Sequence, residues 1–577
     1  MKLGNKTMAL LLALLLAVST AGTAASAKGS KPKPGAKPVP LQQYVEAMQP
    51  GWNLGNTFDA VGMGGSSDPS SEDETAWGNP LVTKELIHQI KKQGFKSIRI
   101  PVTWDVKMGA APDYAIDPAF MDRIEEVVDW SLDEGLYVMI NLHHDSWRWV
   151  NGMGSNYDEV LARYNAAWEQ IADRFKNHSR KLMFESINEP QFYSEDAGSY
   201  QQLLDTLNLS FRDIVRTSGG ENGTRPIVLP TMHTSSDQHH LDALKSSIIG
   251  LNDPNIIVTT HYYGFWPFSV NIAGFTKFDE TTRNDIVQTY DRLYNTFVAE
   301  GIPVVVGEFG LLGFDQHTGT IEQGEKLKFF EYMITYAESK GITHMLWDNG
   351  QHFNRHTYQW NDPQLFEMMK ASWSGRSATA DTDLIFVKRG EPVQDAVVPL
   401  HLNGNKLKKV TLNGKSLKKG KDYSVAGDAI TFNAALLQRL TASGATGERA
   451  KLTTEFNKGA DWTFRVISYE NPVLGGSAGT AASFAIPASF NGDLLATMEA
   501  YYEDGSNAGP QNWTPFKEFA YTFEPSYSTN EIILKQNFFN EVRDGKVILK
   551  FHFWSGTVVE YTVTKQGSVV TGTAVSP

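Results

Sequence analysis

The feature that most constrains the fold is an alternation of short apolar runs with amphipathic helical segments between residues 51 and 350. A continuously apolar run of this length is typical of a strand that is buried on both faces of a parallel sheet. Eight such runs occur, at Gly51–Asn56, Ser97–Val102, Leu136–His143, Leu182–Asn188, Pro226–Met232, Ile256–Tyr262, Ile302–Phe309 and Ile342–Trp347.

The segments between the runs have the apolar spacing of helices that pack one face against a sheet. Asp117-Pro118 has the residue types of a helix N-cap followed by the first helical position. We predict helices at Thr83–Gln93, Ala119–Glu134, Asp158–Asn177, Tyr200–Thr217, Thr281–Glu300 and Glu325–Lys340.

Eight strand–helix units in a single stretch favour an α/β fold, the (β/α)8 TIM barrel, over residues 41–375. The alternative is an open doubly wound sheet, which binds dinucleotides behind a G-x-G-x-x-G turn, and the first turn here has no such motif. Because barrels carry their functional residues at the carboxyl ends of the strands, those positions are the first to inspect.

The overall composition excludes several classes of function. The formal net charge of −13 argues against a nucleic-acid partner, which requires clustered positive charge. The chain has no cysteine, which excludes disulfides, thiolate metal sites and cysteine nucleophiles.

The N-terminus is typical of a secretory signal over residues 1–27. Lys2 and Lys6 precede an apolar run at Met8–Val18, and Ala25-Ser26-Ala27 is a small-x-small cleavage site. The run is shorter than the ~20 residues that span a bilayer. An uncleaved anchor is the alternative. We expect a secreted, extracellular, monomeric protein with no membrane partner, and a Pro/Lys-rich spacer at 28–40.

Two glutamates stand at the ends of the fourth and seventh predicted strands. Glu189 and Glu308 should face each other across the open end of the barrel. Two carboxyl groups across a gap are the equipment of glycoside hydrolysis, in which one gives a proton and the other attacks the anomeric carbon. A lone glutamate at a strand end is more commonly a salt-bridged loop residue.

Other polar and aromatic residues near strand ends argue against the interpretation of these glutamates as salt-bridged loop residues. Arg99 and Tyr263 could keep Glu308 ionised, Asn188 could bond a sugar 2-hydroxyl, and Trp347 could stack on a pyranose ring. The remaining ionisable residues at these positions are His143, His144 and His261.

Two alternative chemistries have weaker support. His143-His144-Asp145 has some of the ligands of a zinc site, but the nearest further pair, His239-His240, lies on a predicted loop-to-helix stretch and is better interpreted as solvated surface. The string G-x-S-x-G occurs once, at 475–479, where no helix follows, so we interpret it as a flexible turn. We therefore expect no metal and no cofactor.

The motifs at 188–190 (Asn-Glu-Pro) and 307–309 (Gly-Glu-Phe) resemble those of glycoside hydrolase family 5, a family of retaining β-glycanases. The resemblance covers about residues 41–375. It implies that Glu189 is the acid/base and Glu308 the nucleophile. It also implies substrate-binding positions at Arg99, His143, Asn188, His261, Tyr263 and Trp347.

Three further segments are similar to the endoglucanases of that family, which include cellulases, lichenases and xyloglucanases. These are GWNLGNTFDA at 51–60, WGNP at 77–80 and NLHHDSW at 141–147. We add Asn56 and His144 to the expected substrate contacts. Aromatic residues in the predicted loops should line a cleft for a polymer, and we expect about half of them to contact sugar, Trp147 and Trp266 among them; the set is Trp147, Trp149, Phe265, Trp266 and Trp360.

The last 200 residues have a different character. A small polar linker is predicted near 372–383, followed by short strands with turns such as Asn413-Gly414. We predict two all-β sandwich modules, one immunoglobulin-like at 376–470 and one at 471–577 that resembles family 46 carbohydrate-binding modules. Trp513 and Trp554 are the predicted sugar contacts of the second.

Taken together, the sequence predicts a secreted retaining endo-β-1,4-glucanase whose partner is a β-glucan such as cellulose, lichenan or xyloglucan. The nearest alternatives keep the chemistry and change the preferred substrate to xyloglucan, mixed-linkage glucan or mannan. A non-catalytic polysaccharide-binding protein on the same scaffold is the alternative of another class, and the presence of both glutamates argues against it.

Overall fold

The computed structural model describes residues 40–62, 73–193 and 197–575. The predicted signal and all of the predicted spacer except Pro40 lie outside these ranges. In the described part of the chain, no helix is both long enough and apolar enough to cross a membrane.

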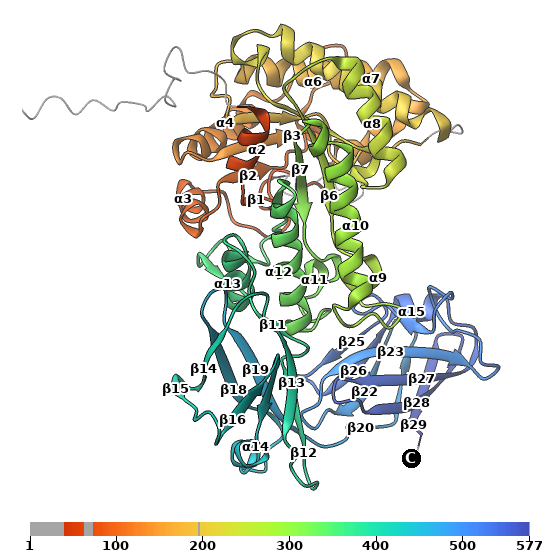
Figure 1. Cartoon of the computed structure of the whole chain (residues 1–577). Helices are drawn as coiled ribbons and strands as arrows, with labels where there is room; N and C mark the ends of the chain where they lie inside the picture. The colour runs from red at the N-terminus through yellow and green to blue at the C-terminus, as the bar shows by residue number, and fades with distance from the viewer. Residues whose placement is uncertain (1–39, 63–72, 194–196, 576–577) are drawn as a thin grey trace, which may run out of the picture.

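The first half of the chain forms a closed barrel of eight parallel strands in sequential order (Figure 1). Each of the eight predicted apolar runs contains one strand, so the predicted TIM barrel is confirmed. The strands are β1 (Gly51–Asn53), β2 (Ser97–Ile100), β3 (Tyr137–Asn141), β4 (Leu182–Glu185), β5 (Ile227–Pro230), β6 (Ile256–Tyr262), β7 (Val304–Phe309) and β8 (Thr343–Leu346).

The six predicted helices are present and surround the barrel. Thr83 caps α3 by accepting a hydrogen bond from the Leu86 N–H, and Asp117 caps α4 ahead of Pro118. The helices are α3 (Lys84–Gln93), α4 (Pro118–Asp133), α6 (Tyr157–Phe175), α7 (Tyr200–Thr217), α10 (Glu280–Thr296) and α12 (Gln323–Ser339). Helix α13 (Pro363–Ser372) was not predicted from the sequence, nor was the full extent of α8 (Gln238–Leu251), whose first turn contains His239 and His240.

The N-terminal end of the barrel is closed. Val45 of helix α2 (Leu41–Ala47) and Met48, which follows the helix, pack against methionine and aliphatic side chains of the barrel strands. These side chains are Met139, Met183, Val228, Ile257, Val305 and Met345. Because that end is plugged with apolar side chains, polar chemistry is left to the opposite end. We call the carboxyl ends of β1–β8 the barrel mouth.

The second module consists of two facing sheets. One has the order β11-β13-β17-β16 and the other β12-β19-β18-β14-β15. Asn413 and Gly414 both have positive φ and form the predicted turn between β14 and β15. The elements are β11 (Thr379–Ala380), β12 (Leu384–Lys388), β13 (Ala396–His401), β14 (Leu407–Leu412), β15 (Lys415–Ser416), β16 (Tyr423–Ala426), β17 (Ala429–Phe432), α14 (Ala434–Thr441), β18 (Gly447–Phe456) and β19 (Trp462–Tyr469).

The segment predicted to be a polar linker near 372–383 is largely packed against the rest of the protein. Ser377, Ala378 and Ala380 are buried, and β11 pairs with β13 inside the second module. Arg376 forms a two-pronged ion pair with Glu331 of α12, at 2.6 and 2.9 Å. The apolar core continues without a break from the barrel into this module. Small side chains occur here because the segment is buried and its backbone packs closely against the second module, where a Cβ atom added to Gly459 would lie 2.8 Å from the Cα of Ser377. Such residues resemble a linker in the sequence.

The third module is one long antiparallel sheet folded over a separate core. A flexible turn was predicted at 475–479, but Ser477–Thr480 forms strand β21. The Ser477 hydroxyl donates a hydrogen bond to the Ala485 carbonyl. The elements are β20 (Val473–Leu474), β21 (Ser477–Thr480), β22 (Ser483–Ser489), β23 (Leu495–Tyr502), β24 (Phe516–Lys517), β25 (Phe523–Ser526), β26 (Glu531–Lys535), α15 (Gln536–Asn540), β27 (Gly545–Phe553), β28 (Val558–Gln566) and β29 (Val569–Ala574).

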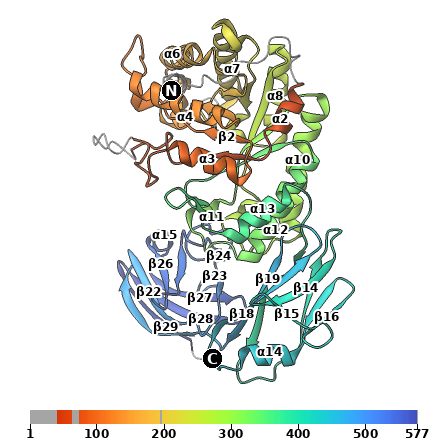
Figure 2. The same cartoon turned by 90° about the vertical axis from the view of Figure 1, so that its left-hand side faces the viewer.

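The two β modules lie side by side at one end of the barrel domain (Figures 1 and 2). The third module contacts the barrel as well as the second module. Asn271, in the segment after β6, donates a hydrogen bond to the Ala496 carbonyl of β23 at 2.9 Å. The three parts therefore form a closed set of contacts, and the third module is held beside the barrel from two sides.

Candidate active site

The barrel mouth brings the two predicted glutamates together. Glu308 lies in β7 opposite His261 of β6, and the register of the two strands shifts just before this pair. A second shift follows Val306 where β7 pairs with β8. Such irregularities re-aim side chains at the rims of barrels, and here they occur on both sides of Glu308.

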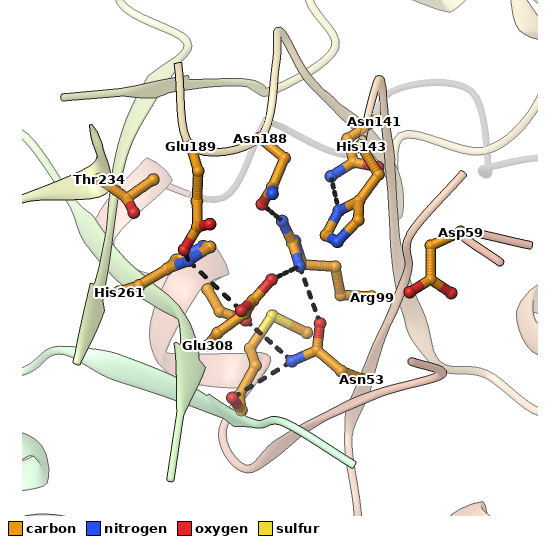
Figure 3. A network of polar contacts seen from close by, with 12 residues as sticks. Asn53, Asp59, Arg99, Asn141, His143, Asn188, Glu189, Thr234, His261 and Glu308 are labelled. Carbon is orange, nitrogen blue, oxygen red and sulfur yellow. Dashed lines mark hydrogen bonds and ion pairs between the residues drawn. The ribbon is translucent and has the colours of Figure 1, made fainter. Parts of the chain in front are cut away.

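Arg99 is the centre of the polar network (Figure 3). Its fully buried guanidinium donates to Glu185 at 2.8 Å and to Glu308 at 2.7 Å. It also donates to the side-chain oxygens of Asn53 at 3.0 Å and Asn188 at 2.7 Å. One arginine therefore shares its charge between two carboxylates and fixes both asparagine side chains.

Glu308 is held as an acceptor from two sides. Arg99 binds Oε1, and the Tyr263 hydroxyl donates to Oε2 at 2.6 Å. Burial, together with the charge of Glu308, raises the pKa of Tyr263 well above its usual value, so this hydroxyl stays protonated and continues to donate. The Glu308 side chain is only 6% exposed. A carboxylate that is positioned and partly desolvated in this way is suited to nucleophilic attack.

Glu189 has a different environment. Its backbone φ is +39°, an unusual conformation for a residue other than glycine, and its side chain is 46% exposed. His261 Nδ1 lies 2.9 Å from Oε1 of Glu189 and 3.4 Å from Oε2 of Glu308. Glu189 is therefore exposed at the barrel mouth while it remains hydrogen-bonded to His261.

Glu189 and His261 shift each other's pKa. Burial would raise the pKa of Glu189, but the hydrogen bond and charge of His261, with the charge of Arg99, hold that pKa below its usual value. Burial would lower the pKa of His261, but Glu308 and Glu189 raise it overall. The pair therefore retains one proton above the usual pKa of a histidine, and in the free protein that proton rests on His261.

The separation of the two carboxyl groups bears on the stereochemistry. Oxygen atoms of Glu189 and Glu308 and a nitrogen of His261 all lie within 4.8 Å of one another. Retaining glycosidases have carboxyl groups about 5–5.5 Å apart, whereas inverting enzymes leave about 6.5–9.5 Å for a water molecule. An approach this close favours a retaining site over an inverting one.

His143 and His144 lie on the other side of Arg99 and are neutral. Burial lowers the pKa of His143 well below its usual value and that of His144 to about 4. The ring of His143 stacks on Trp347 at a centroid distance of 5.8 Å and an angle of 5°. Asn56 begins a tight turn with φ of +53°, and its N–H donates to Asp59.

Two clusters in the described residues have donors close enough for a metal ion, Asp59–His143–His144 and Glu189–His261–Glu308. In the first, His144 Nδ1 accepts a hydrogen bond from the Trp147 indole at 2.9 Å. A neutral His144 therefore carries its hydrogen on Nε2, the atom nearest Asp59, and offers no lone pair there. The second cluster is occupied by its own short hydrogen bonds. Neither arrangement favours a metal.

Comparison with known proteins agrees with this geometry. Residues 58–353 match the cellulase family (glycosyl hydrolase family 5), 379–466 match carbohydrate binding domain X2, and 470–573 match the carbohydrate binding domain CBM46. The chain belongs to glycosyl hydrolase family 5. It is a glycoside hydrolase, and the predicted family, immunoglobulin-like module and family 46 module are all confirmed.

Relatives share the whole architecture of this enzyme. Endoglucanase B of Paenibacillus lautus is 57% identical over 572 residues, which is 98% of both chains. The solved tri-modular endo-β-1,4-glucanase B of Bacillus halodurans is 56% identical with a TM-score of 0.91, covering 94% of this chain and 100% of that one. A tri-modular family 5 endo-β-1,4-glucanase of Bacillus licheniformis, solved with cellotetraose, is 32% identical with a TM-score of 0.78, covering 93% of this chain and 100% of that one.

The predicted aromatic residues separate into two groups. Trp147 and Trp266 are 37% and 43% exposed and remain candidates for sugar contact. Trp360 does not: it stacks on Phe366 of α13 at 4.2 Å and donates to Gln93 of α3, so it belongs to the outer packing of the barrel. The indole N–H of Trp149 donates a hydrogen bond to Asp145, and the ring of Phe265 packs edge-on against that of Phe275.

The two tryptophans predicted for the third module lie in different places. Trp513 is 58% exposed, and its ring centroid is 6.4 Å from that of Trp266 on the barrel. Trp554 is half-buried, and its backbone N–H donates to the carbonyl of Leu494, which lines a cavity of about 600 Å³ between the second and third modules. Only Trp513 is placed beside a barrel residue that the sequence analysis had selected.

Two residues that hold Arg99 in position, Glu185 and Asn53, were not predicted from the sequence. Glu185 is fully buried in β4, where it accepts from Arg99 and from Asn141 at 2.8 Å each. Asn53 holds Arg99 and donates to the Gly307 carbonyl beside Glu308. A glutamate in an otherwise apolar strand was the available signal, because a buried carboxylate requires a buried cation.

Proposed function

We propose that this family 5 enzyme is a secreted, monomeric endo-β-1,4-glucanase that cleaves internal bonds of β-glucans by double displacement, with retention of configuration. The observation that carries the mechanism is the unequal environment of the two carboxyl groups. Glu308 is buried and bound by two donors, whereas Glu189 faces the cleft and shares a proton with His261.

In the first step, a carboxylate oxygen of Glu308 attacks the anomeric carbon of the sugar bound at the barrel mouth. The bond from that carbon to the glycosidic oxygen breaks, and Glu189 gives its proton to the departing oxygen. The product is a glycosyl ester of Glu308 and a shortened glucan. The proton held by the Glu189–His261 pair supplies this step once it moves onto Glu189.

In the second step, Glu189 takes a proton from a water molecule whose oxygen attacks the anomeric carbon of the ester. The bond to Glu308 breaks, and both carboxyl groups return to their starting states. Arg99 and Tyr263 stay hydrogen-bonded near Glu308 throughout and stabilise the carboxylate as it leaves.

The remaining site residues bind the sugar in this proposal. Arg99 takes the side-chain oxygen of Asn188, which leaves the amide N–H groups to bond a sugar 2-hydroxyl, an interaction that strengthens in the transition state. Trp347 stacked on His143 provides a flat apolar floor. Asn56, His144, Trp147 and Trp266 contact further sugars along the cleft.

We assign the contact with longer chains to Trp513 of the third module. Its exposed ring stands beside the exposed ring of Trp266, so the two modules present adjacent apolar surfaces. Pyranose faces stack on such rings. The related solved proteins are endo-β-1,4-glucanases, one of them in complex with cellotetraose. Cellulose-type and mixed-linkage glucans or xyloglucan are therefore the substrates that we propose first.

The test is reducing-end release from carboxymethylcellulose, barley β-glucan, tamarind xyloglucan and a mannan, with Glu308→Gln beside the wild type. We expect activity on glucans that the variant lacks, and the ranking identifies the preferred polymer. Activity on mannan alone would overturn the substrate, and an active Glu308→Gln variant would overturn the site. Mass measurement of the exported chain tests removal of residues 1–27, and size-exclusion chromatography with light scattering tests the monomer.

A further inference from the structure

Asn271 is a barrel residue with an unusual position between two modules. It lies five residues after Trp266, is 4% exposed and has a φ of +52°. Its Nδ2 donates to the Thr320 carbonyl of the barrel at 3.1 Å and to the Ala496 carbonyl of β23 at 2.9 Å. Its own carbonyl accepts from the Phe519 N–H at 3.2 Å.

These bonds bracket the segment that carries Trp513. Ala496 lies on β23, Phe519 follows β24, and the loop with Trp513 runs between those two strands. From β24, the buried ammonium of Lys517 reaches into that loop and donates to the carbonyls of Pro510 at 2.8 Å and Thr514 at 3.0 Å. The loop is thus fixed internally by Lys517, and its two flanks are fixed to the barrel by Asn271.

The backbone near Asn271 also fits closely against the third module. A Cβ atom added to Gly274, whose φ is +81°, would lie 3.3 Å from the ring of Phe516. A side chain at that position would therefore be strained and crowded. On the barrel side, Ser269 Oγ accepts from the Leu312 N–H at 2.9 Å. The segment from Trp266 to Gly274 is held by the barrel and meets Phe516 closely.

We infer that Asn271 is a positioning residue: its hydrogen bonds lock the third module onto the barrel and thereby set the distance between Trp513 and Trp266. This inference rests on the proposed sugar contact of those two rings. Modules joined by small interfaces move relative to each other by default. A buried amide that bonds both sides opposes that motion, because separation would break its hydrogen bond to the Ala496 carbonyl and the bond from the Phe519 N–H to its own carbonyl.

The primary variant is Asn271→Asp, which keeps the shape and tolerates positive φ but places a carboxylate oxygen against the carbonyls of Thr320 and Ala496. Asn271→Gly is the second variant, because it keeps the backbone conformation and removes the side chain. Asn252→Gly is the matched control, since Asn252 also has positive φ, at +49°, but ends helix α8.

The measurements are kcat/KM on the preferred polymer, kcat/KM on an aryl β-cellotrioside, and small-angle X-ray scattering of the full chain. We expect both Asn271 variants to lower kcat/KM on the polymer about 3- to 10-fold, as loss of one stacking platform would. The aryl substrate should be cleaved as by the wild type, and the radius of gyration should increase. Asn252→Gly should change none of the three.

The combination with Trp513→Ala separates positioning from general damage. If Asn271 acts through Trp513, the double variant loses no more polymer activity than Trp513→Ala alone. Fully additive losses, or unchanged scattering in both Asn271 variants, would overturn the inference. If Trp513→Ala has no effect on any polymer, the proposed sugar contact is wrong, whereas the scattering result still decides whether Asn271 locks the module.

Discussion

The barrel mouth and the contact between barrel and third module are built on opposite principles. At the mouth, Arg99 binds two carboxylates and two amides inside a nearly closed network. At the module contact, two exposed tryptophan rings lie beside each other at an angle, and one buried amide holds the flanks of the loop that carries Trp513. Bond cleavage needs charges that are fixed before the substrate arrives, whereas polymer binding needs apolar rings that are held at a suitable spacing.

This difference predicts how losses should be distributed. A change in the network at the mouth should affect every substrate, because all of them pass through the same transition state. A change at the module contact should affect only substrates long enough to reach it. The following experiments compare the two regions, beginning with the largest effect.

Removal of either catalytic carboxyl group should have the largest effect, and azide should distinguish the two roles. With an aryl β-cellobioside, Glu189→Ala should lose about 10²–10⁴-fold in turnover because the ester intermediate waits for a base. Added azide should attack that intermediate and give a β-glycosyl azide. Glu308→Ala should form no ester, so any rescued product would be the α-glycosyl azide. The same anomer from both variants, identified by NMR, would contradict the assignment.

Glu185→Gln should be next in size. It leaves the charge of Arg99 entirely on Glu308, which weakens the nucleophile, and we expect kcat to fall about tenfold or more on short and long substrates alike. Loss of one partner from a buried ion pair should also lower the free energy of unfolding by about 3–5 kcal/mol.

The matched control for Glu185→Gln is Glu331→Gln. Glu331 is equally buried and ion-paired, but its partner is Arg376 at the joint with the second module. Glu331→Gln should destabilise the enzyme in thermal unfolding without changing kcat at a temperature where it remains folded. Equal falls in kcat for both variants would mean that Glu185 acts only through stability.

His261→Asn should move the alkaline limb of the pH profile of kcat/KM to lower pH. In the wild type, the proton needed for acid catalysis is shared, and the raised pKa of His261 keeps it bound above the ordinary pKa of a histidine. In the variant, Glu189 holds the proton alone and loses it at lower pH. An alkaline limb that stays in place would show that another group sets it.

The smallest effect should come from Trp513→Ala. We expect kcat/KM on polymers to fall about 2- to 10-fold, the contribution of one aromatic platform, with no change on aryl β-cellobioside. Trp554→Ala is the matched comparison from the same module, since the side chain of Trp554 is half-buried whereas that of Trp513 is exposed. A larger loss for Trp554→Ala than for Trp513→Ala would reverse our assignment of the sugar-binding face.

The barrel could be predicted because each buried strand requires an uninterrupted apolar run, and runs of that kind place their polar neighbours at one edge. Glu189 and Glu308 followed directly from that rule. Glu185 did not, because it lies in the middle of the predicted apolar run 182–188, and its pairing with Arg99 explains a charge there. Two opposite charges at matching depths of apolar runs are a usable signal for such pairs.

Long-range packing set the limit of the sequence analysis. Trp360 and Trp347 both follow β8, yet one packs under α13 and the other lies at the mouth, and no local pattern separates them. The pairing of Trp266 with Trp513 depends on how two modules dock across more than 200 residues of sequence. The buried segment around Ala378 has the composition of a linker because small residues suit both free chain and close packing.

The unbroken core between the barrel and the second module has a thermodynamic consequence. Residues that share one apolar cluster cannot expose it separately, so these two parts should unfold as a single cooperative unit, while the third module, with its own core, can open independently. Substitutions in the core of the third module should therefore leave the fold of the catalytic barrel intact. Substitutions in the core of the second module should destabilise the barrel as well.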